Sequence, residues 1–321
     1  MVSARRESVA ICVPTFRRPA DLTRLLAALP AVIETAQDAG GVGEVVVIVI
    51  DNDDAETART IVSEAPLPVR YVVEQERGVV AVRNRALDEA AGNDLAVFID
   101  DDETPADARW LLQLTRTRAD FDADVVAGPV RTVTDVPLDT WIVAGGFFSR
   151  SHRVGLETGS PIERAATNNL LLDLRFVERS GTRFDPRFAR TGGEDSLFTS
   201  QLHARGARMV WCAEAVVLDH LPEKRRTRAH ALERTQGMAN AGARVALALA
   251  ASPARRMVVR LRSSASGTVR WMAGAARGTV GFVLRSERLL AIGARERARG
   301  RGSIAGARDR TQHLYGGGGI R

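Results

Sequence analysis

The feature that most constrains this chain is a regular alternation of apolar, strand-like runs with helical segments over about the first hundred residues. The strand-like runs are residues 8–13, 44–50, 69–73 and 95–99. Helical spacing follows the first run, at Leu22, Leu25, Leu26 and Leu29, and residues 79–91 also read as a helix. The run at 44–50 is almost continuously apolar, as in a strand covered on both faces. This alternation predicts right-handed βαβ units and a doubly wound α/β fold.

Two acidic clusters, residues 51–54 and 100–103, directly follow two of these strand-like runs. Ligands of open parallel sheets bind beyond the carboxyl ends of the strands. Neighbouring carboxylates repel one another unless a cation is present, and Mg²⁺ or Mn²⁺ prefers carboxylate and phosphate oxygens. An ordinary solvated turn is the alternative, but the position after a buried strand favours a metal and ligand site.

Four further residues could carry chemistry, although each has an ordinary structural interpretation. The chain has no glycine-rich phosphate loop, so a diphosphate would need a metal and an arginine, such as Arg83 near a predicted helix start. Glu194 and Asp195 follow two glycines at another helix start, where they either favour the helix dipole or present a general base. His220, at the end of a strand-like run, is either structural or a metal ligand.

The pattern becomes less regular after residue 104. A helix is expected at 110–118, a strand at 124–130, a helix from 194 to 203, and strands at 208–212 and 215–218. Residues 131–165 are rich in glycine, proline and polar residues, with aromatics that look exposed at Trp141, Phe147 and Phe148. Such aromatics could stack on a sugar, or they could pack within the protein.

Charge divides the chain into two parts of opposite sign. From Lys224 onward there are 21 Lys+Arg and 4 Asp+Glu, a balance of +17, whereas the preceding 223 residues have a balance of −11. Arginines alternate with apolar residues in this tail, a pattern typical of amphipathic helices on anionic membranes. A helical bundle against the first domain and a nucleic-acid contact are the alternatives.

Composition excludes collagen-like, disordered and disulfide-rich proteins. The two cysteines, Cys12 and Cys212, lie in apolar runs and are expected to be buried, reduced thiols of a cytosolic protein. We see no signal-peptide pattern in the first residues and no apolar run of about 18 residues, so neither a leader nor a membrane-spanning helix is expected.

Taken together, the motifs resemble those of the family 2 glycosyltransferases, which have the GT-A fold. The matching stretches are residues 13–19, 49–53, 82–86, 98–103 and 192–195. A Gly-Gly-Phe-Phe stretch at 145–148 and the Gly-Gly-Glu-Asp stretch at 192–195 are most similar to bacterial exopolysaccharide glucosyltransferases of the succinoglycan type. The resemblance covers about residues 8–225, and five motifs in the same order and spacing make it specific.

The resemblance implies a role for each matching residue. The donor nucleotide would be bound by Pro14, Thr15, Phe16, Arg17, Asp51, Asp53, Arg83, Asn84, Asp100 and Asp101. Asp102, with His220 as an additional ligand, would hold Mg²⁺ or Mn²⁺, although three consecutive aspartates leave the metal-binding pair open. Asp195 would be the catalytic base, supported by Glu194. Trp141, Phe147 and Phe148 would contact the acceptor.

The resemblance also implies an inverting, metal-dependent transfer of a sugar from a UDP-sugar to a lipid-linked or saccharide acceptor, in the synthesis of cell-surface polysaccharide. Residues 1–223 would form the GT-A domain and 224–321 a basic, mainly helical extension. We expect a cytoplasmic protein, peripheral on an anionic surface at the inner face of the cell membrane, with no nucleic-acid partner. The alternatives are a transferase that charges a polyprenyl phosphate, and a nucleic-acid-binding protein that uses the arginine-rich tail.

Overall fold

The computed structural model describes residues 6–149, 153, 155–189 and 191–310. The chain divides into two compact units, and each is described by itself. The first consists of Met1–Val133, Arg153–Pro186 and Phe198–His220, and the second of Thr134–His152, Arg187–Leu197 and Leu221–Arg321. The second unit therefore combines the basic tail with two segments that precede it in the chain.

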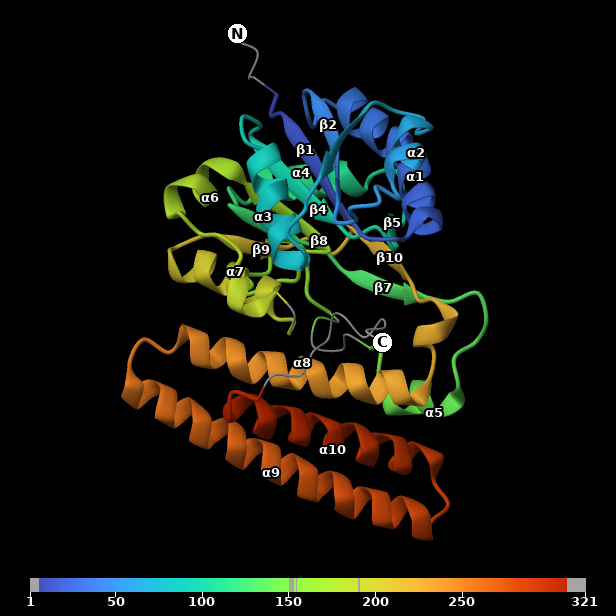
Figure 1. The fold of residues 1–321 in the computed structure, drawn as a ribbon, viewed down its shortest axis with the longest axis vertical. Coiled ribbons are helices and arrows are strands. Elements are labelled where there is room, and N and C mark those ends of the chain that lie inside the picture. The colour runs from blue at the N-terminus through green and yellow to red at the C-terminus, as the bar shows by residue number, and fades with distance from the viewer. Residues whose placement is uncertain (1–5, 150–152, 154, 190, 311–321) are drawn as a thin grey trace. The chain divides into compact units, whose positions relative to one another are not determined.

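A seven-stranded sheet with the order β3-β2-β1-β4-β8-β6-β9 forms the centre of the first unit (Figure 1). Its strands are β1 (Val9–Thr15), β2 (Val45–Asp51), β3 (Val69–Val73), β4 (Leu95–Ile99), β6 (Val125–Ala127), β8 (Asn169–Asp173) and β9 (Met209–Trp211). The first four strands pair in parallel, which confirms the predicted α/β fold. β8 was not predicted from the sequence; it runs antiparallel to both β4 and β6 and makes the sheet mixed.

A second, three-stranded sheet has the order β5-β10-β7. Its strands are β5 (Glu103–Pro105), β10 (Val217–His220) and β7 (Val130–Val133). The single strand predicted at 124–130 is in fact divided, because Gly128 and Pro129 interrupt it between the large and the small sheet. The small sheet begins directly after the acidic run 100–102 and places Asp219 opposite Glu103.

Helices cover both faces of the large sheet, because both faces are apolar. Alternate residues of β1, beginning with Val9, share a core with α1 (Pro19–Asp38) and α4 (Trp110–Asp120). Cys12 faces the other side, where its thiol contacts the Ala86 carbonyl of α3 (Val79–Glu89). The shorter helices are α2 (Arg59–Ser63), α6 (Leu174–Ser180), α7 (Glu194–Ala204) and the 3₁₀ turn η2 (Pro186–Phe188). Both cysteines are buried and free, as predicted.

Three long helices make up most of the second unit. They are α8 (Arg228–Leu249), α9 (Pro253–Val283) and α10 (Glu287–Ala307), preceded by α5 (Thr140–Gly145) and the 3₁₀ turn η3 (Glu223–Arg225). α10 packs against both α8 and α9 (Figure 1). The tail is therefore helical, as predicted. Within the described residues, every helix is too short or too polar to cross a bilayer.

Candidate active site

The carboxyl ends of β1, β2 and β4 lie side by side, because these strands are adjacent and parallel. Thr15, the last residue of β1, pairs with Asp51, the last residue of β2. On the other side, the hydroxyl of Thr15 donates a hydrogen bond of 2.8 Å to Oδ2 of Asp101, which follows β4. The first sequence motif and both acidic clusters are thus brought to the same end of the sheet.

Arg18 distinguishes the three consecutive aspartates that follow β4. Its Nη1 lies 2.8 Å from Oδ1 of Asp101 and 2.7 Å from Oδ2 of Asp102. Asp101 is buried, with one oxygen bonded to Thr15 and the other to Arg18. Burial, partly offset by Arg18, raises the pKa of Asp101 to about 7. Asp100 is more exposed, and its Oδ1 lies 3.6 Å from Nη2 of Arg83. The three carboxyl groups therefore have three different environments.

Asp51 is fully buried and holds the loop after β2 in shape. Its Oδ1 accepts a hydrogen bond of 3.0 Å from the Asp53 N–H, and its Oδ2 accepts from the Ala58 N–H at 3.0 Å. The Tyr71 hydroxyl donates to the same Oδ2 at 2.8 Å. Burial and this bond raise the pKa of Tyr71, so the hydroxyl stays a donor. Both oxygens of Asp51 are used by the protein, and its contact with a nucleotide stays a prediction.

Phe16 is an exposed aromatic residue at the end of β1, flanked by two guanidinium groups. Those of Arg17 and Arg77 lie 5.0 and 5.1 Å from the centre of its ring. Arg17 forms a two-point ion pair with the buried Asp53, at 3.0 and 3.1 Å, which lowers the pKa of that carboxyl group. A planar ring between cations offers stacking for a base and positive charge for phosphates. Pro14, half-buried in β1, lies two residues before it.

Asn52 connects the loop after β2 to the segment that precedes α3. Its Oδ1 accepts from the Gly78 N–H at 2.9 Å, and its Nδ2 donates to the carbonyls of Glu74 and Glu76 at 2.8 and 2.7 Å. Arg77 Nη1 donates to the Asn52 carbonyl at 2.8 Å. Gly78, with φ 126°, adopts a backbone conformation that other residues rarely reach.

Sequence reasoning missed three residues of this site, namely Arg18, Asn52 and Arg77. Arg18 and Asn52 lie inside the motifs at 13–19 and 49–53, and Arg77 directly precedes the glycine that starts α3. Their positions in those motifs were the available signal. Their partners, however, lie between 22 and 84 positions away, so only the fold identifies them.

Arg83 and Asn84 stand at neighbouring positions of α3 and differ in their contacts. Arg83 is buried, near Asp100, with its guanidinium 5.9 Å from the centre of the Phe184 ring. The side-chain amide of Asn84 forms two hydrogen bonds with the backbone of Phe184. Its Nδ2 donates to the carbonyl at 3.0 Å, and its Oδ1 accepts from the N–H at 2.9 Å. Arg83 thus lies by the acidic run, and its contact with a nucleotide stays a prediction, while the amide of Asn84 holds the backbone of Phe184.

His220 lies beside the acidic run through the small sheet. The backbone N–H of His220 donates to the backbone carbonyl of Asp102 at 3.1 Å, and its ring Nε2 lies 2.8 Å from the Thr104 hydroxyl. The chain segments of the proposed metal ligands are therefore neighbours, although the ring nitrogen is bonded to Thr104. The role of His220 as a ligand stays a prediction.

The carboxylates after β4 suit a hard divalent cation that takes its remaining ligands from a phosphate and from water. Among the residues that the structure describes, no three His, Cys, Asp or Glu side chains are grouped to hold a metal by themselves. Mg²⁺ is commonly held by only one or two carboxylates, and phosphate and water oxygens complete its coordination. Asp100 and Asp102 supply such oxygens at the carboxyl end of β4. This donor set fits a cation that is shared with a diphosphate ligand.

Glu194 and Asp195 begin α7 and belong to the second unit. Gly193 precedes them with φ 91°, and a Cβ there would lie 3.1 Å from Val245 and 3.2 Å from Ala241 of α8. Glu194 is buried, whereas Asp195 is half-buried and accepts a hydrogen bond of 2.6 Å from the Ser196 N–H. Asp195 is thus the more accessible carboxylate, at a helix start that stabilises its charge.

The aromatics of the 131–165 segment are less exposed than the sequence suggested. Trp141 and Phe147 stack with ring centres 4.8 Å apart, and both are buried in a cluster with Ala231 and Ala291 of the tail helices. The expectation of exposure is therefore wrong for these two, because α8 and α10 cover them. Phe148 is half-buried, with the Arg234 guanidinium 5.7 Å from its ring centre.

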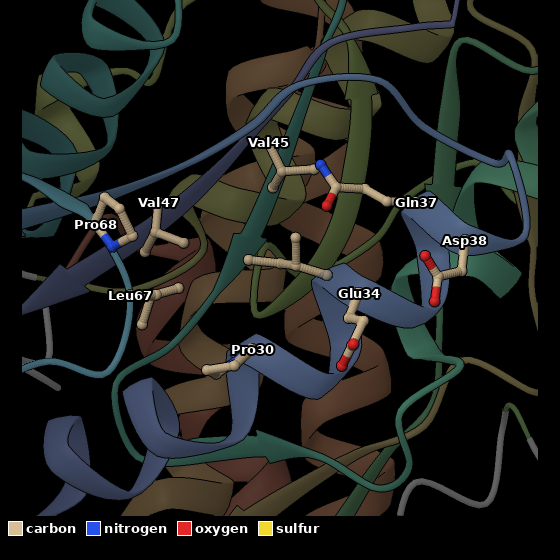
Figure 2. Close-up of a pocket in the computed structure, with 9 residues that line it drawn as sticks. Pro30, Glu34, Gln37, Asp38, Val45, Val47, Leu67 and Pro68 are labelled. Atoms are coloured by element: carbon tan, nitrogen blue, oxygen red, sulfur yellow. The ribbon is translucent and has the colours of Figure 1, made fainter.

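A pocket of about 290 Å³ lies elsewhere in the first unit, between α1, β2 and the two residues that precede β3. Figure 2 shows Pro30, Glu34, Gln37 and Asp38 of α1 facing Val45, Val47, Leu67 and Pro68. Its charged lining is acidic, and it contains no arginine or lysine that could neutralise a phosphate. The pocket includes none of the residues discussed above, so it does not compete with the strand-end site for an anionic ligand.

Comparisons with known proteins agree with this geometry. A family model described as glycosyl transferase family 2 matches residues 10–168. The chain is 34% identical over 223 residues to the succinoglycan biosynthesis protein ExoM of Rhizobium meliloti (strain 1021), and the match covers 68% of each chain.

Two solved structures share the fold at low sequence identity. S. aureus TarS 1-349 in complex with UDP-GlcNAc has a TM-score of 0.51 at 14% identity, over 90% of each chain. GalNAc-T7 with UDP, GalNAc and Mn²⁺ has a TM-score of 0.54 at 12% identity, over 76% of this chain and 48% of that one.

Proposed function

The chain belongs to glycosyltransferase family 2, and from that premise we propose that it transfers a sugar from a UDP-sugar to a saccharide acceptor, with inversion of the anomeric centre. The relative with 34% identity takes part in succinoglycan biosynthesis, which supports a product in cell-surface polysaccharide. The two structural neighbours were solved with UDP or UDP-GlcNAc, which supports UDP as the nucleotide.

The observation that carries the donor site is the meeting of β1 and β4 at Thr15, Arg18, Asp101 and Asp102. In this proposal the base stacks near Phe16, and Arg17, Arg77 and Arg83 provide positive charge for the phosphates. Asp51, Asp53, Asn84 and Asp101 then act mainly by holding the surrounding loops, since their carboxylate and amide groups already bond within the protein.

Asp100 and Asp102, with His220 as a further candidate, would hold Mg²⁺ or Mn²⁺ in this proposal. When bound, such a cation supplies positive charge to the diphosphate that leaves. The chain itself contributes Arg18, which lies on Asp101 and Asp102 and limits the repulsion between them. Burial lowers the pKa of Arg18, but the two carboxylates raise it by more than burial lowers it. The pKa therefore stays above its ordinary value, and the guanidinium remains charged.

Asp195 is proposed as the general base. Its carboxylate takes the proton of the acceptor hydroxyl while that oxygen bonds to the anomeric carbon. The bond from the anomeric carbon to the β-phosphate oxygen breaks, and UDP leaves with the electron pair. This single displacement inverts the centre and needs no nucleophile from the enzyme. The buried Glu194 keeps the start of α7 in place.

We also propose a lipid-linked acceptor and a location at the inner face of the cell membrane. The support is the balance of +17 in the tail, which favours an anionic surface. Phe148, the least buried of the three aromatics that we assign to the acceptor, is the best candidate for that contact.

The test is a donor screen with the full chain. UDP-sugars are added with Mn²⁺, with Mg²⁺ or with EDTA, and donor binding is read as a thermal shift, since a ligand of the folded state raises its stability. Release of UDP and the anomeric configuration of the product then report the reaction. We expect one UDP-sugar to bind and turn over only with the metal. Turnover that EDTA does not affect would contradict the proposed dependence on a divalent metal. Retention of the anomeric configuration would contradict the single displacement in which Asp195 is the general base.

A further inference from the structure

The long helix α9 has one buried face and, opposite to it, an exposed apolar face. Gly267, Gly274, Gly278 and Gly281 are buried against α10, while most of the other residues of α9 are accessible. Residues of the opposite side recur every three or four positions, which places them in one row along the helix. They are Val258, Leu261, Ala265, Val269, Met272, Ala276, Val280 and Val283, and we call them the α9 stripe.

The α9 stripe is unusually exposed for apolar residues. Leu261, Val269, Met272 and Val283 are 63%, 66%, 61% and 72% exposed. A row of this kind that runs the length of a 31-residue helix is a contiguous apolar surface. Such surfaces on folded proteins mark sites that bind an apolar partner.

Arginines lie along one edge of the α9 stripe. At 100° per residue, Arg255, Arg262, Arg270 and Arg277 project beside the stripe, and all four are exposed. Arg270 has a distant ion pair with Glu296, at 3.7 Å. The other three have no carboxylate within ion-pair distance among the residues that the structure describes. α9 contains six arginines and no acidic residue.

This combination selects one class of partner. A second copy packed stripe to stripe would bring two rows of arginines together without acidic residues to pair with them. A nucleic acid would bind the arginines and leave the apolar row in water. An anionic bilayer satisfies both features, because acyl chains accept apolar side chains and lipid phosphates pair with arginine. α9 would lie along the surface, since its glycine face remains on α10.

We propose that α9 is an in-plane membrane anchor. The α9 stripe enters the boundary between headgroups and acyl chains of an anionic bilayer, and the arginines beside it bind lipid phosphates. This deepens the proposed function by naming the surface that meets the membrane. It rests on that function only for the purpose of the anchor, which is to hold the sugar transferase at its acceptor. The chemistry requires anionic lipid but no particular headgroup.

The experiment uses the full chain and vesicles of phosphatidylcholine, with or without about a third of phosphatidylglycerol. Co-sedimentation measures binding. We expect binding to anionic vesicles that is weakened by salt. Neutral vesicles should bind far less.

Two variants test the two features separately. Leu261→Ser/Met272→Ser/Val283→Ser should weaken binding at least about tenfold. Its control, Val136→Ser/Val143→Ser/Met238→Ser, alters exposed apolar residues away from α9 and should bind as the wild type does. Arg255→Gln/Arg262→Gln/Arg277→Gln should weaken binding to anionic vesicles at least about tenfold. Arg24→Gln/Arg59→Gln/Arg109→Gln removes the same charge from the first unit and should have a much smaller effect.

Three results would overturn the proposal. They are a full chain that ignores anionic vesicles at low salt, a stripe variant that binds like the wild type, and a dimer that the stripe variant abolishes while the wild type fails to bind vesicles. Donor turnover is measured in the same samples. Binding without any turnover would count against the proposed function alone, and turnover without binding would count against the anchor alone.

Discussion

At the scale of single residues, neighbouring side chains of the same type have different tasks. Asp100, Asp101 and Asp102 are adjacent in the chain, yet Asp101 is tied to Thr15 and Arg18 while Asp100 is the most accessible. Burial favours the protonated form of a carboxyl group, and for Asp101 this effect outweighs the nearby charge of Arg18, so its pKa is raised. The same contrast separates the buried Glu194 from the accessible Asp195.

Replacing Asp102 by alanine should weaken metal-dependent donor binding at least about tenfold, because the cation would lose a carboxylate ligand. Calorimetric titration of UDP with and without Mn²⁺ measures the change. Asp107→Ala is the control, since Asp107 is an exposed acid of the same unit outside the site. An unchanged effect of Mn²⁺ in the Asp102 variant would place the cation elsewhere.

Replacing Asp195 by asparagine should leave donor binding intact and slow sugar transfer by about 10²- to 10⁴-fold, since the side chain keeps its size and loses its basicity. Steady-state transfer and a separate donor titration distinguish the two effects. Asp120→Asn, at the exposed end of α4, is the control. Transfer close to the wild-type rate would remove Asp195 from the role of base.

At the scale of elements, close backbone contact holds the tail helices together. Gly300 of α10 lies against α9, and a Cβ there would come within 2.5 Å of the Gly267 carbonyl and 2.8 Å of the Trp271 nitrogen. Side chains larger than hydrogen would force the two helices apart. The arrangement of α9 and its exposed stripe therefore depends on small residues along α10.

Two glycine-to-alanine substitutions should have opposite effects. Gly300→Ala should destabilise the protein by about 1–3 kcal/mol, because its methyl group meets backbone atoms. Gly242→Ala, in α8, should stabilise it by about 0.5–1 kcal/mol, because nothing lies within 4 Å and alanine favours a helix. Urea unfolding of both variants measures the difference. Equal effects would mean that α9 and α10 are not packed so closely.

At the scale of the whole molecule, the charge boundary and the packing of the second unit lead to different expectations. The change of net charge at Lys224 predicts a domain boundary after residue 223. Within the second unit, however, Trp141 and Phe147 pack on Ala231 and Ala291, and Phe188 and Leu197 pack on Val245. The tail thus completes apolar clusters that begin earlier in the chain.

A chain that ends at residue 223 should therefore be less soluble and should lose donor turnover, because the partners of Trp141, Phe147 and Leu197 are removed. Burial of such side chains is worth about 1.5–3 kcal/mol each. Sedimentation and thermal unfolding compare it with a chain that ends at residue 310 and keeps all three tail helices. A soluble, donor-binding form of the shorter chain would favour the boundary at 223 instead.

Local pattern in the sequence was sufficient for the α/β class, for most strands and helices, and for the order of the motifs. The reason is that strand and helix periodicity, and acidic residues after buried strands, are properties of short segments. β8 was missed because a five-residue apolar run carries no sign of its direction or of its neighbours.

Only the tertiary structure decided how the residues are used, because the deciding contacts join distant positions. Thr15 meets Asp101 across 86 positions, and Arg18 meets Asp101 across 83. Trp141 and Phe147 became core residues because tail helices cover them, and the α9 stripe became a surface because its opposite face is taken by α10. Burial depends on which elements pack together, and that depends on the fold of the whole chain.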